Sequence, residues 1–315
     1  MRHVAISGAV AFCLIVLSTR GLAAQNTPIP ISDCENITQP GNYVLANDLV
    51  LTASVLDVGQ GGNCLVISSS HVKINLSGHT ITVACPPFSS CPAELGPVGG
   101  IGIDIVNGAD FVRISNGTVD NFVYGIAAQA NHMSVINLEV RAVVGLALDN
   151  VSYSAFTNIA YEGADLRYHG SNGPVVHLDG GGKNIFWKLT GSVGSDVGQP
   201  RGIEVLNSNT NLIAGVNVTD SSSCGSTDVL LSNGSSSNTV MNSTLFDLCG
   251  NGIEVDVGGR HNVIFGNTVS IAAPMGVFAM VDQNSNCGSD VWAGNTFSNI
   301  FAAGQISASP ATCIH

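Results

Sequence analysis

One pattern of short apolar strands and sharp turns recurs through most of the chain, at intervals of 20 to 30 residues. Its clearest copy is Gly252–Val269, where Ile253 and Val255 alternate with acidic residues and a second short strand leads to a turn at Gly266. A unit of this kind cannot bury its apolar face alone, so neighbouring copies must stack on one another. The pattern therefore predicts a solenoid made of β-strand coils.

Two positions recur from coil to coil, and each is recognised by a different sequence feature. The first is an inward apolar residue of an alternating strand, found at Ile103, Ile126, Leu146, Val176, Ile203, Val229, Ile253 and Val277. The second is a turn residue, found at Asn116, Asn137, Asn158, Lys188, Gly215, Asn242, Gly266 and Gly294. Asn and Gly accept a positive φ more readily than other residues, so every coil is expected to make the same bend.

The composition favours an all-β fold. Charged residues make up only 10% of the chain, helix-forming Lys, Glu and Arg are scarce, and β-branched residues are common. The formal net charge of -12 argues against nucleic acid or an anionic membrane surface as a partner.

The first 24 residues have the features of a secretory signal peptide. A basic start is followed by an apolar run from Val4 to Leu17, and small residues end the segment at Ala24. No later run of about 18 apolar residues occurs, so we expect no membrane association after cleavage. The mature protein is expected to be secreted to the extracellular space, or to the periplasm if the source is Gram-negative.

Eight cysteines remain after residue 24, and an even number in an exported chain indicates disulfides. Two pairs are about one coil apart in sequence, and equivalent positions on stacked coils lie roughly 4.8 Å apart, within the reach of a disulfide. The predicted pairs are Cys224–Cys249 and Cys287–Cys313 and, by remainder, Cys85–Cys91 and Cys34–Cys64.

The coils resemble the right-handed parallel β-helix of the pectin-lyase-like superfamily. The stretches PGNYVLANDL at 40–49 and VKINLSGHTI at 72–81 also resemble the opening of many bacterial β-helix proteins. The resemblance implies an all-β, single-stranded solenoid of about nine to ten coils with three short parallel sheets. We expect a capping segment at 25–62, the β-helix at 63–297 and a closing tail at 298–315. The superfamily's catalytic signatures, such as a Gly-His-Gly tripeptide, are absent, so the candidate site rests on geometry.

Stacking brings several ionisable side chains together on the outward face of the first strand, beside three long loops at 161–173, 190–200 and 218–227. The candidate catalytic residues are Asp149, His177, Asp179, Glu204, Arg167, Lys183 and Arg201, and the candidate substrate contacts are Tyr161, Tyr168, His169 and Lys188. Asp149 and Asp179 should lie about 5 Å apart, close enough to hold a metal ion such as calcium. The alternative is that these carboxylates are ordinary solvated side chains.

These residues suggest a monomeric, exported protein that binds an extracellular polysaccharide or glycan surface. If it is an enzyme, the superfamily resemblance favours a lyase-like cleavage of a uronic-acid polymer. A cation on the two aspartates would acidify the proton next to the uronate carboxylate, with one of the Lys or Arg residues, or His177, as base. The less favoured alternative is a hydrolase in which Asp149 and Asp179 act as acid and base. The rival hypothesis is a non-catalytic scaffold or adhesin whose long loops contact a partner.

Overall fold

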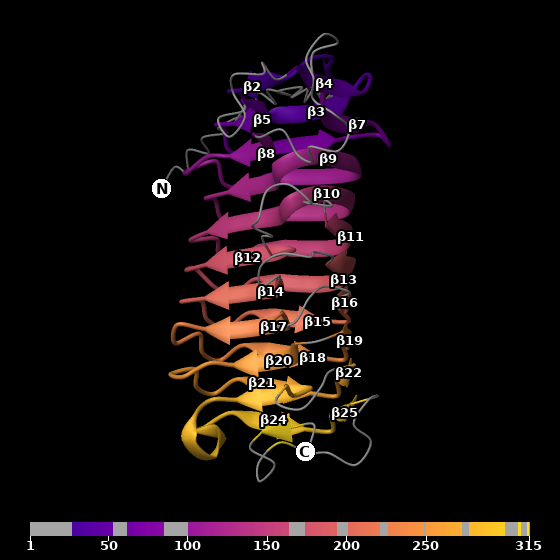
Figure 1. Cartoon of the computed structure of the whole chain (residues 1–315). Coiled ribbons are helices and arrows are strands. Elements are labelled where there is room, and N and C mark those ends of the chain that lie inside the picture. The colour runs from indigo at the N-terminus through magenta and orange to yellow at the C-terminus, as the bar shows by residue number, and fades with distance from the viewer. Residues whose placement is uncertain are drawn as a thin grey trace, which may run out of the picture.

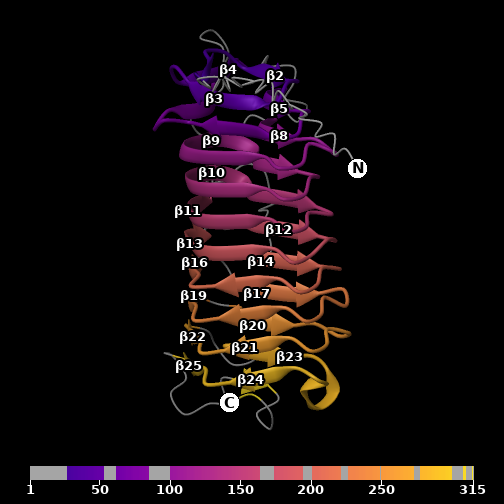
Figure 2. The same cartoon turned by 180° about the vertical axis from the view of Figure 1, so that it is seen from behind.

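The structure is a computed structural model that describes residues 27–52, 62–84, 100–163, 174–193, 201–220, 226–248, 250–272, 277–299, 308–309 and 314. The chain winds as a stack of coils in one long column, with the N-terminal strands at one end and the C-terminal strands at the other (Figure 1 and Figure 2). The described part holds one short 3-10 helix, Ser285–Cys287, and no α-helix. None of its segments is therefore a helix that could cross a bilayer.

The strands form three ladders of parallel pairs, one on each side of the coil. The first ladder contains β2 (Glu35–Ile37), β5 (Asn63–Ile67), β8 (Ile101–Ile105), β12 (Val176–Asp179), β14 (Arg201–Leu206), β17 (Thr227–Ser232), β20 (Asn251–Val255), β23 (Met280–Asp282) and β26 (Ala308–Ser309). The second contains β1 (Ile29–Ile31), β3 (Gly41–Leu45), β6 (Val72–Asn75), β15 (Leu212–Ala214), β18 (Thr239–Met241), β21 (Val263–Phe265) and β24 (Val291–Ala293). The third contains β4 (Leu49–Thr52), β7 (Thr80–Ala84), β16 (Asn217–Asp220), β19 (Thr244–Asp247), β22 (Thr268–Ile271) and β25 (Thr296–Asn299).

Four long strands join the ladders. β9 (Arg113–Ala128) and β10 (Ser134–Asp149) bend through all three, while β11 (Ala155–Gly163) and β13 (Ile185–Val193) run through the second and third. This is the predicted architecture, a right-handed parallel β-helix. Its interior is a continuous column of buried aliphatic side chains with a stacked pair of phenylalanines, Phe156 and Phe186, whose ring centroids are 5.0 Å apart.

The turn position predicted from the sequence is confirmed in all eight coils. The apolar residues two places before it, from Ile114 to Trp292, are register partners on successive strands. Every turn residue has a positive φ, between 51° and 65°. Lys188 adopts the same left-handed conformation, with a φ of 55°, although it is neither Asn nor Gly.

The first-strand register is confirmed from Ile103 to Ile253 and is wrong in the last coil. Met280, and not Val277, pairs with Ile253. Residues 277–281 are all apolar, so the alternation that fixes a register elsewhere gives no signal there.

Strands β1 to β4 lie inside segment 25–62 and already pair with later coils. The predicted Cys34–Cys64 disulfide links β5 to the residue just before β2, with a Cα–Cα distance of 4.5 Å. Cys287 is disulfide-bonded, and its expected partner, Cys313, lies outside the described residues. Both members of Cys85–Cys91 and of Cys224–Cys249 lie outside them as well.

A row of buried asparagines ties the coils together at the bend before the second ladder. In Asn184, Asn211, Asn238 and Asn262, each side-chain Oδ1 accepts a hydrogen bond from a backbone N–H of the preceding coil. Asn238 has no exposed surface, and its Nδ2 donates to the Ser208 carbonyl at 3.0 Å. Because buried polar groups need partners, these amides hold successive coils in one register.

Replacing Asn238 by leucine should lower the free energy of unfolding by about 3 kcal/mol or more, since each buried partner left unsatisfied costs about 1–3 kcal/mol. The matched control is Asn137→Gly at an exposed turn, where glycine accepts the φ of 54° and the expected loss is under about 1 kcal/mol. Urea denaturation of both variants checks this, and equal losses would contradict a stabilising role for the buried row.

Candidate functional site

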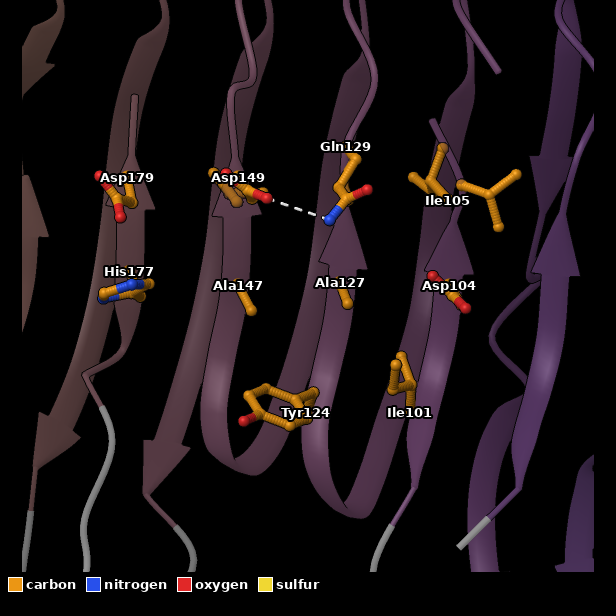
Figure 3. A pocket seen from close by; sticks show the side chains of 13 residues that line it. Ile101, Asp104, Ile105, Tyr124, Ala127, Gln129, Ala147, Asp149, His177 and Asp179 are labelled. Atoms are coloured by element: carbon orange, nitrogen blue, oxygen red, sulfur yellow. Dashed lines mark hydrogen bonds between the residues drawn. The ribbon is translucent and has the colours of Figure 1, made fainter. Parts of the chain in front are cut away.

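A groove with a volume of about 550 Å³ lies on the outward face of the first ladder. It crosses strands β8, β9, β10 and β12, so its walls come from residues that are distant in sequence (Figure 3). Its polar and aromatic lining side chains are Asp104, Tyr124, Gln129, Asp149, His177 and Asp179. We call this surface the acidic groove.

The groove is hollow because two alanines occupy its middle. Asp104, Ala127, Ala147 and His177 are register partners on four successive coils. The small side chains of Ala127 and Ala147 leave an open floor between Asp104 at one end and His177 at the other, a span of roughly 14 Å at the spacing of parallel strands. Figure 3 shows the two alanines between the larger side chains.

Asp149 and Asp179 are direct register partners on β10 and β12. Asp149 accepts hydrogen bonds from Gln129 Nε2 at 3.0 Å and from Asn150 Nδ2 at 2.8 Å. Asp179 accepts one from Asn207 Nδ2 at 2.9 Å. These amides hold the two carboxylates on neighbouring coils, about 5 Å apart at the strand level.

His177 is held by a buried carboxylate on the next coil. Its Nδ1 lies 2.7 Å from Oε2 of Glu204, whose side chain is only 8% exposed, while Oε1 of Glu204 contacts the Arg201 guanidinium. A carboxylate accepts hydrogen bonds, so Nδ1 is the ring nitrogen that donates to Glu204, and Nε2 is the nitrogen left to contact a ligand. Glu204 and Arg201 therefore position His177, whose ring lines the groove.

Asp104 forms the opposite end of the groove, and Tyr124 lies beside the floor on β9, the strand that also carries Ala127 (Figure 3). Asp104 accepts a hydrogen bond from Asn63 Nδ2 at 2.6 Å, and burial raises the pKa of its carboxyl above 3.8, while that hydrogen bond opposes the rise. Tyr124 is 40% exposed, so part of its ring is free to contact a ligand. Neither residue was among the predicted site members; the two successive alanines, Ala127 and Ala147, in the outward column were the available sequence signal.

Several predicted site residues lie elsewhere. Tyr161 was predicted as an exposed substrate contact, and this is wrong: the side chain is in the core, its hydroxyl donates to the Ala142 carbonyl at 2.9 Å, and burial raises its pKa. Lys183 turns away from the groove, because its Nζ donates to the Tyr153 hydroxyl at 2.8 Å and lies over that ring.

The remaining predicted contacts do not add to the described groove. Lys188 occupies the exposed turn at the end of the second ladder and is absent from the groove lining. Arg167, Tyr168 and His169 lie outside the described residues, as do most of the three predicted loops.

Within the described ranges, no three His, Cys, Asp or Glu side chains are grouped to hold a metal ion. Asp149 and Asp179 alone supply two carboxylates, whereas calcium takes six to eight oxygen ligands. A calcium ion there would need most of its ligands from substrate and water, so the predicted calcium remains a hypothesis.

Charge also limits what this surface can accept. Three carboxylates and one imidazole line the acidic groove, and its described lining residues include neither lysine nor arginine. Arg201, one of the predicted bases, is engaged with Glu204. An anionic ligand would therefore meet like charge, whereas a neutral hydroxyl-rich ligand can donate hydrogen bonds to the carboxylates.

No family model matches the sequence, and no curated protein matches it. Similar folds among solved structures include an alginate lyase from Paenibacillus sp., with a TM-score of 0.52 and 14% identity over 82% of this chain and 97% of that chain. Another is the Dettilon tailspike protein, with a TM-score of 0.50 and 13% identity over 82% of this chain and 61% of the tailspike chain. These similarities establish the fold, a parallel β-helix.

The raised pKa of Asp104 predicts a pH-dependent effect on stability. Its contribution is fully present below the unfolded pKa of about 3.8 and is lost as pH rises through the higher folded pKa, because the unfolded chain ionises first. Asp104→Asn should therefore become more stable relative to the wild type between about pH 3 and pH 7. Urea denaturation at several pH values measures the difference.

Asp48 provides a control, because its pKa is shifted in the direction opposite to that of Asp104. Hydrogen bonds from the Thr80 N–H and from His79 lower the pKa of its carboxyl, so its contribution is present above the unfolded pKa and is lost at lower pH. Asp48→Asn should lose stability relative to the wild type as pH rises. The assignment for Asp104 fails if the two variants shift in the same direction.

Proposed function

We propose that this is an exported protein that binds a polysaccharide chain in the acidic groove, with the chain lying along the β-helix axis. The observation that carries the proposal is the open alanine floor, bordered on four successive coils by carboxylate, amide, imidazole and phenol groups. Sugar hydroxyls are matched by closely spaced hydrogen-bonding side chains, and the exposed Tyr124 ring offers an apolar surface to a sugar face. The fold it shares with an alginate lyase supports the carbohydrate class.

The charge of the groove favours a neutral polysaccharide over a uronic-acid polymer. Lyase-like chemistry requires a cation or a basic side chain to neutralise the uronate carboxylate, and the described lining offers only His177. We therefore place hydrolysis of a neutral glycan ahead of lyase-like cleavage as the chemistry of this groove.

Two features support a catalytic role in addition to binding. Asp149 and Asp179 sit on adjacent coils at a backbone spacing near the roughly 5 Å that separates the carboxyl groups of retaining glycosidases. His177 is oriented by Glu204 in the manner of a general base, with its free nitrogen available to water or a sugar hydroxyl. In this proposal the aspartates act as acid and nucleophile, and His177 assists proton transfer.

Filling the floor tests the binding proposal directly. Ala147→Trp should reduce affinity for the bound polysaccharide at least about tenfold, because the indole would occupy the space between Asp104 and His177. Ala160→Trp, on an exposed position of β11 in the third ladder, is the matched control and should bind normally. Titration calorimetry against neutral and uronic polysaccharides measures both, and equal affinity of the two variants would exclude this groove.

Cleavage is tested with the same panel by following new reducing ends and the ultraviolet absorbance of unsaturated ends. A hydrolase produces only the first signal, and Asp149→Asn or Asp179→Asn should abolish it. Glu204→Gln should lower kcat with little change in KM, because Glu204 positions His177 without contacting the substrate. Binding without either signal would instead identify a non-catalytic scaffold or adhesin.

A further inference from the structure

A second groove, of about 280 Å³, lies on the outward face of the second ladder near the N-terminal end, across β3, β6 and β9. Its polar lining residues include Asn42, Lys73, Asn75, Arg113 and Ser115, and none of its described lining residues carries a carboxylate. We call it the basic groove. It shares no lining residue with the acidic groove, which lies on the first ladder.

The two cations of the basic groove occupy directly opposed positions. Lys73 on β6 and Arg113 on β9 are register partners, so their backbones are only about 4.8 Å apart. Both side chains are exposed, and neither forms an ion pair with any residue in the described ranges. Like charges at opposed positions of neighbouring strands destabilise a sheet unless a counter-charge lies between them.

The adjacent cations Lys73 and Arg113 contrast with the acidic composition of the chain. The chain has only 10 Lys and Arg residues against 22 Asp and Glu. Two other described cations are paired with carboxylates, Arg141 with Glu139 and Glu162 and Arg201 with Glu204, whereas Lys188 and Arg260 are exposed and line neither groove. In so acidic a protein, two adjacent cations that have no carboxylate partner in the described part of the chain favour an anion from outside the chain as their counter-charge.

A neutral donor beside the cations is held in a fixed orientation. Asn75 Oδ1 accepts hydrogen bonds from the Ser77 N–H at 3.0 Å and from Asn116 Nδ2 at 3.1 Å. With its oxygen occupied in this way, Asn75 presents its Nδ2 group as a donor on the face that carries Lys73 and Arg113. Guanidinium, ammonium and amide donors together match the oxygens of a carboxylate or sulfate group.

We propose that the basic groove binds an acidic polysaccharide through a carboxylate or sulfate group, which would lie between Lys73 and Arg113. The protein then carries two glycan surfaces of opposite charge on different sides of the same coils. The acidic groove takes neutral sugar, and the basic groove takes the charged group. A protein of this kind can link two kinds of polysaccharide chain.

The test measures binding of oligogalacturonate, dextran sulfate and uncharged dextran to the full chain by titration calorimetry. At least one anionic ligand should bind, and its affinity should fall as salt is raised from about 0.01 M to about 1 M, because the Debye length shortens from about 30 Å to about 3 Å. Lys73→Ala with Arg113→Ala should weaken that binding at least about tenfold at low salt.

The control removes the same amount of charge elsewhere. Lys188→Asn with Arg260→Ala alters two exposed cations outside the basic groove, and asparagine suits the positive φ at 188. This variant should keep most of the affinity. Equal weakening in the two double variants, or no binding of either anionic ligand, would overturn the proposal.

A further variant separates this proposal from that for the acidic groove. Asp149→Asn with Asp179→Asn should lose neutral-glycan binding and keep anionic-glycan binding. If the neutral ligands do not bind but an anionic ligand does, the proposal for the acidic groove is wrong and that for the basic groove holds. Loss of anionic-glycan binding in this variant would contradict the existence of two independent sites. Thermal melting of each variant establishes that the fold is retained.

Discussion

The structure depends on the exact superposition of successive coils through parallel backbone hydrogen bonds. Each coil makes the same left-handed bend at one residue, and eight of these residues fall in a single column from Asn116 to Gly294. Buried asparagine amides add a second row of bonds between coils. Because neither row tolerates a change of register, residues separated by a whole coil become neighbours about 4.8 Å apart.

This constraint explains why the outward surface can carry different chemistries. The inward residues fill one continuous apolar column and support every coil in the same way. The outward residues do not fill that column, so they can vary more freely than the core residues do. Asp149 and Asp179 on one ladder, and Lys73 and Arg113 on another, are pairs made by the same stacking rule. Each pair concentrates one sign of charge on one side of the coil.

Periodicity allowed much of this arrangement to be predicted from the sequence. The turn column and the first-ladder register as far as Ile253 follow from it. The Cys34–Cys64 bond was predicted only by remainder, after other cysteines had been paired, and it is present. The pairing of Met280 with Ile253 could not be predicted, because an uninterrupted apolar run has no alternation of apolar and polar residues to fix the register. The periodic pattern predicts which backbone positions are neighbours, but it does not predict the orientation or the contacts of a long side chain.

The site residues illustrate that limit. Tyr161 was expected to be exposed, yet its ring is buried and its hydroxyl is bonded to carbonyl groups of the previous coil. Glu204 was placed correctly in the outward column, but a histidine on one side and an arginine on the other bury its carboxylate. The hollow itself comes from Ala127 and Ala147, whose small side chains carry no reactive group and are therefore overlooked when only reactive residues are sought in the sequence.

The most direct test is a crystal structure of the protein with the tightest-binding neutral oligosaccharide of the panel. Sugar density should cross β9, β10 and β12 over Ala127 and Ala147, with hydroxyl groups within hydrogen-bonding distance of Asp149 and Asp179. Density confined to another face of the coil, with the alanine floor still holding only water, would contradict the central claim that stacking builds a glycan site there.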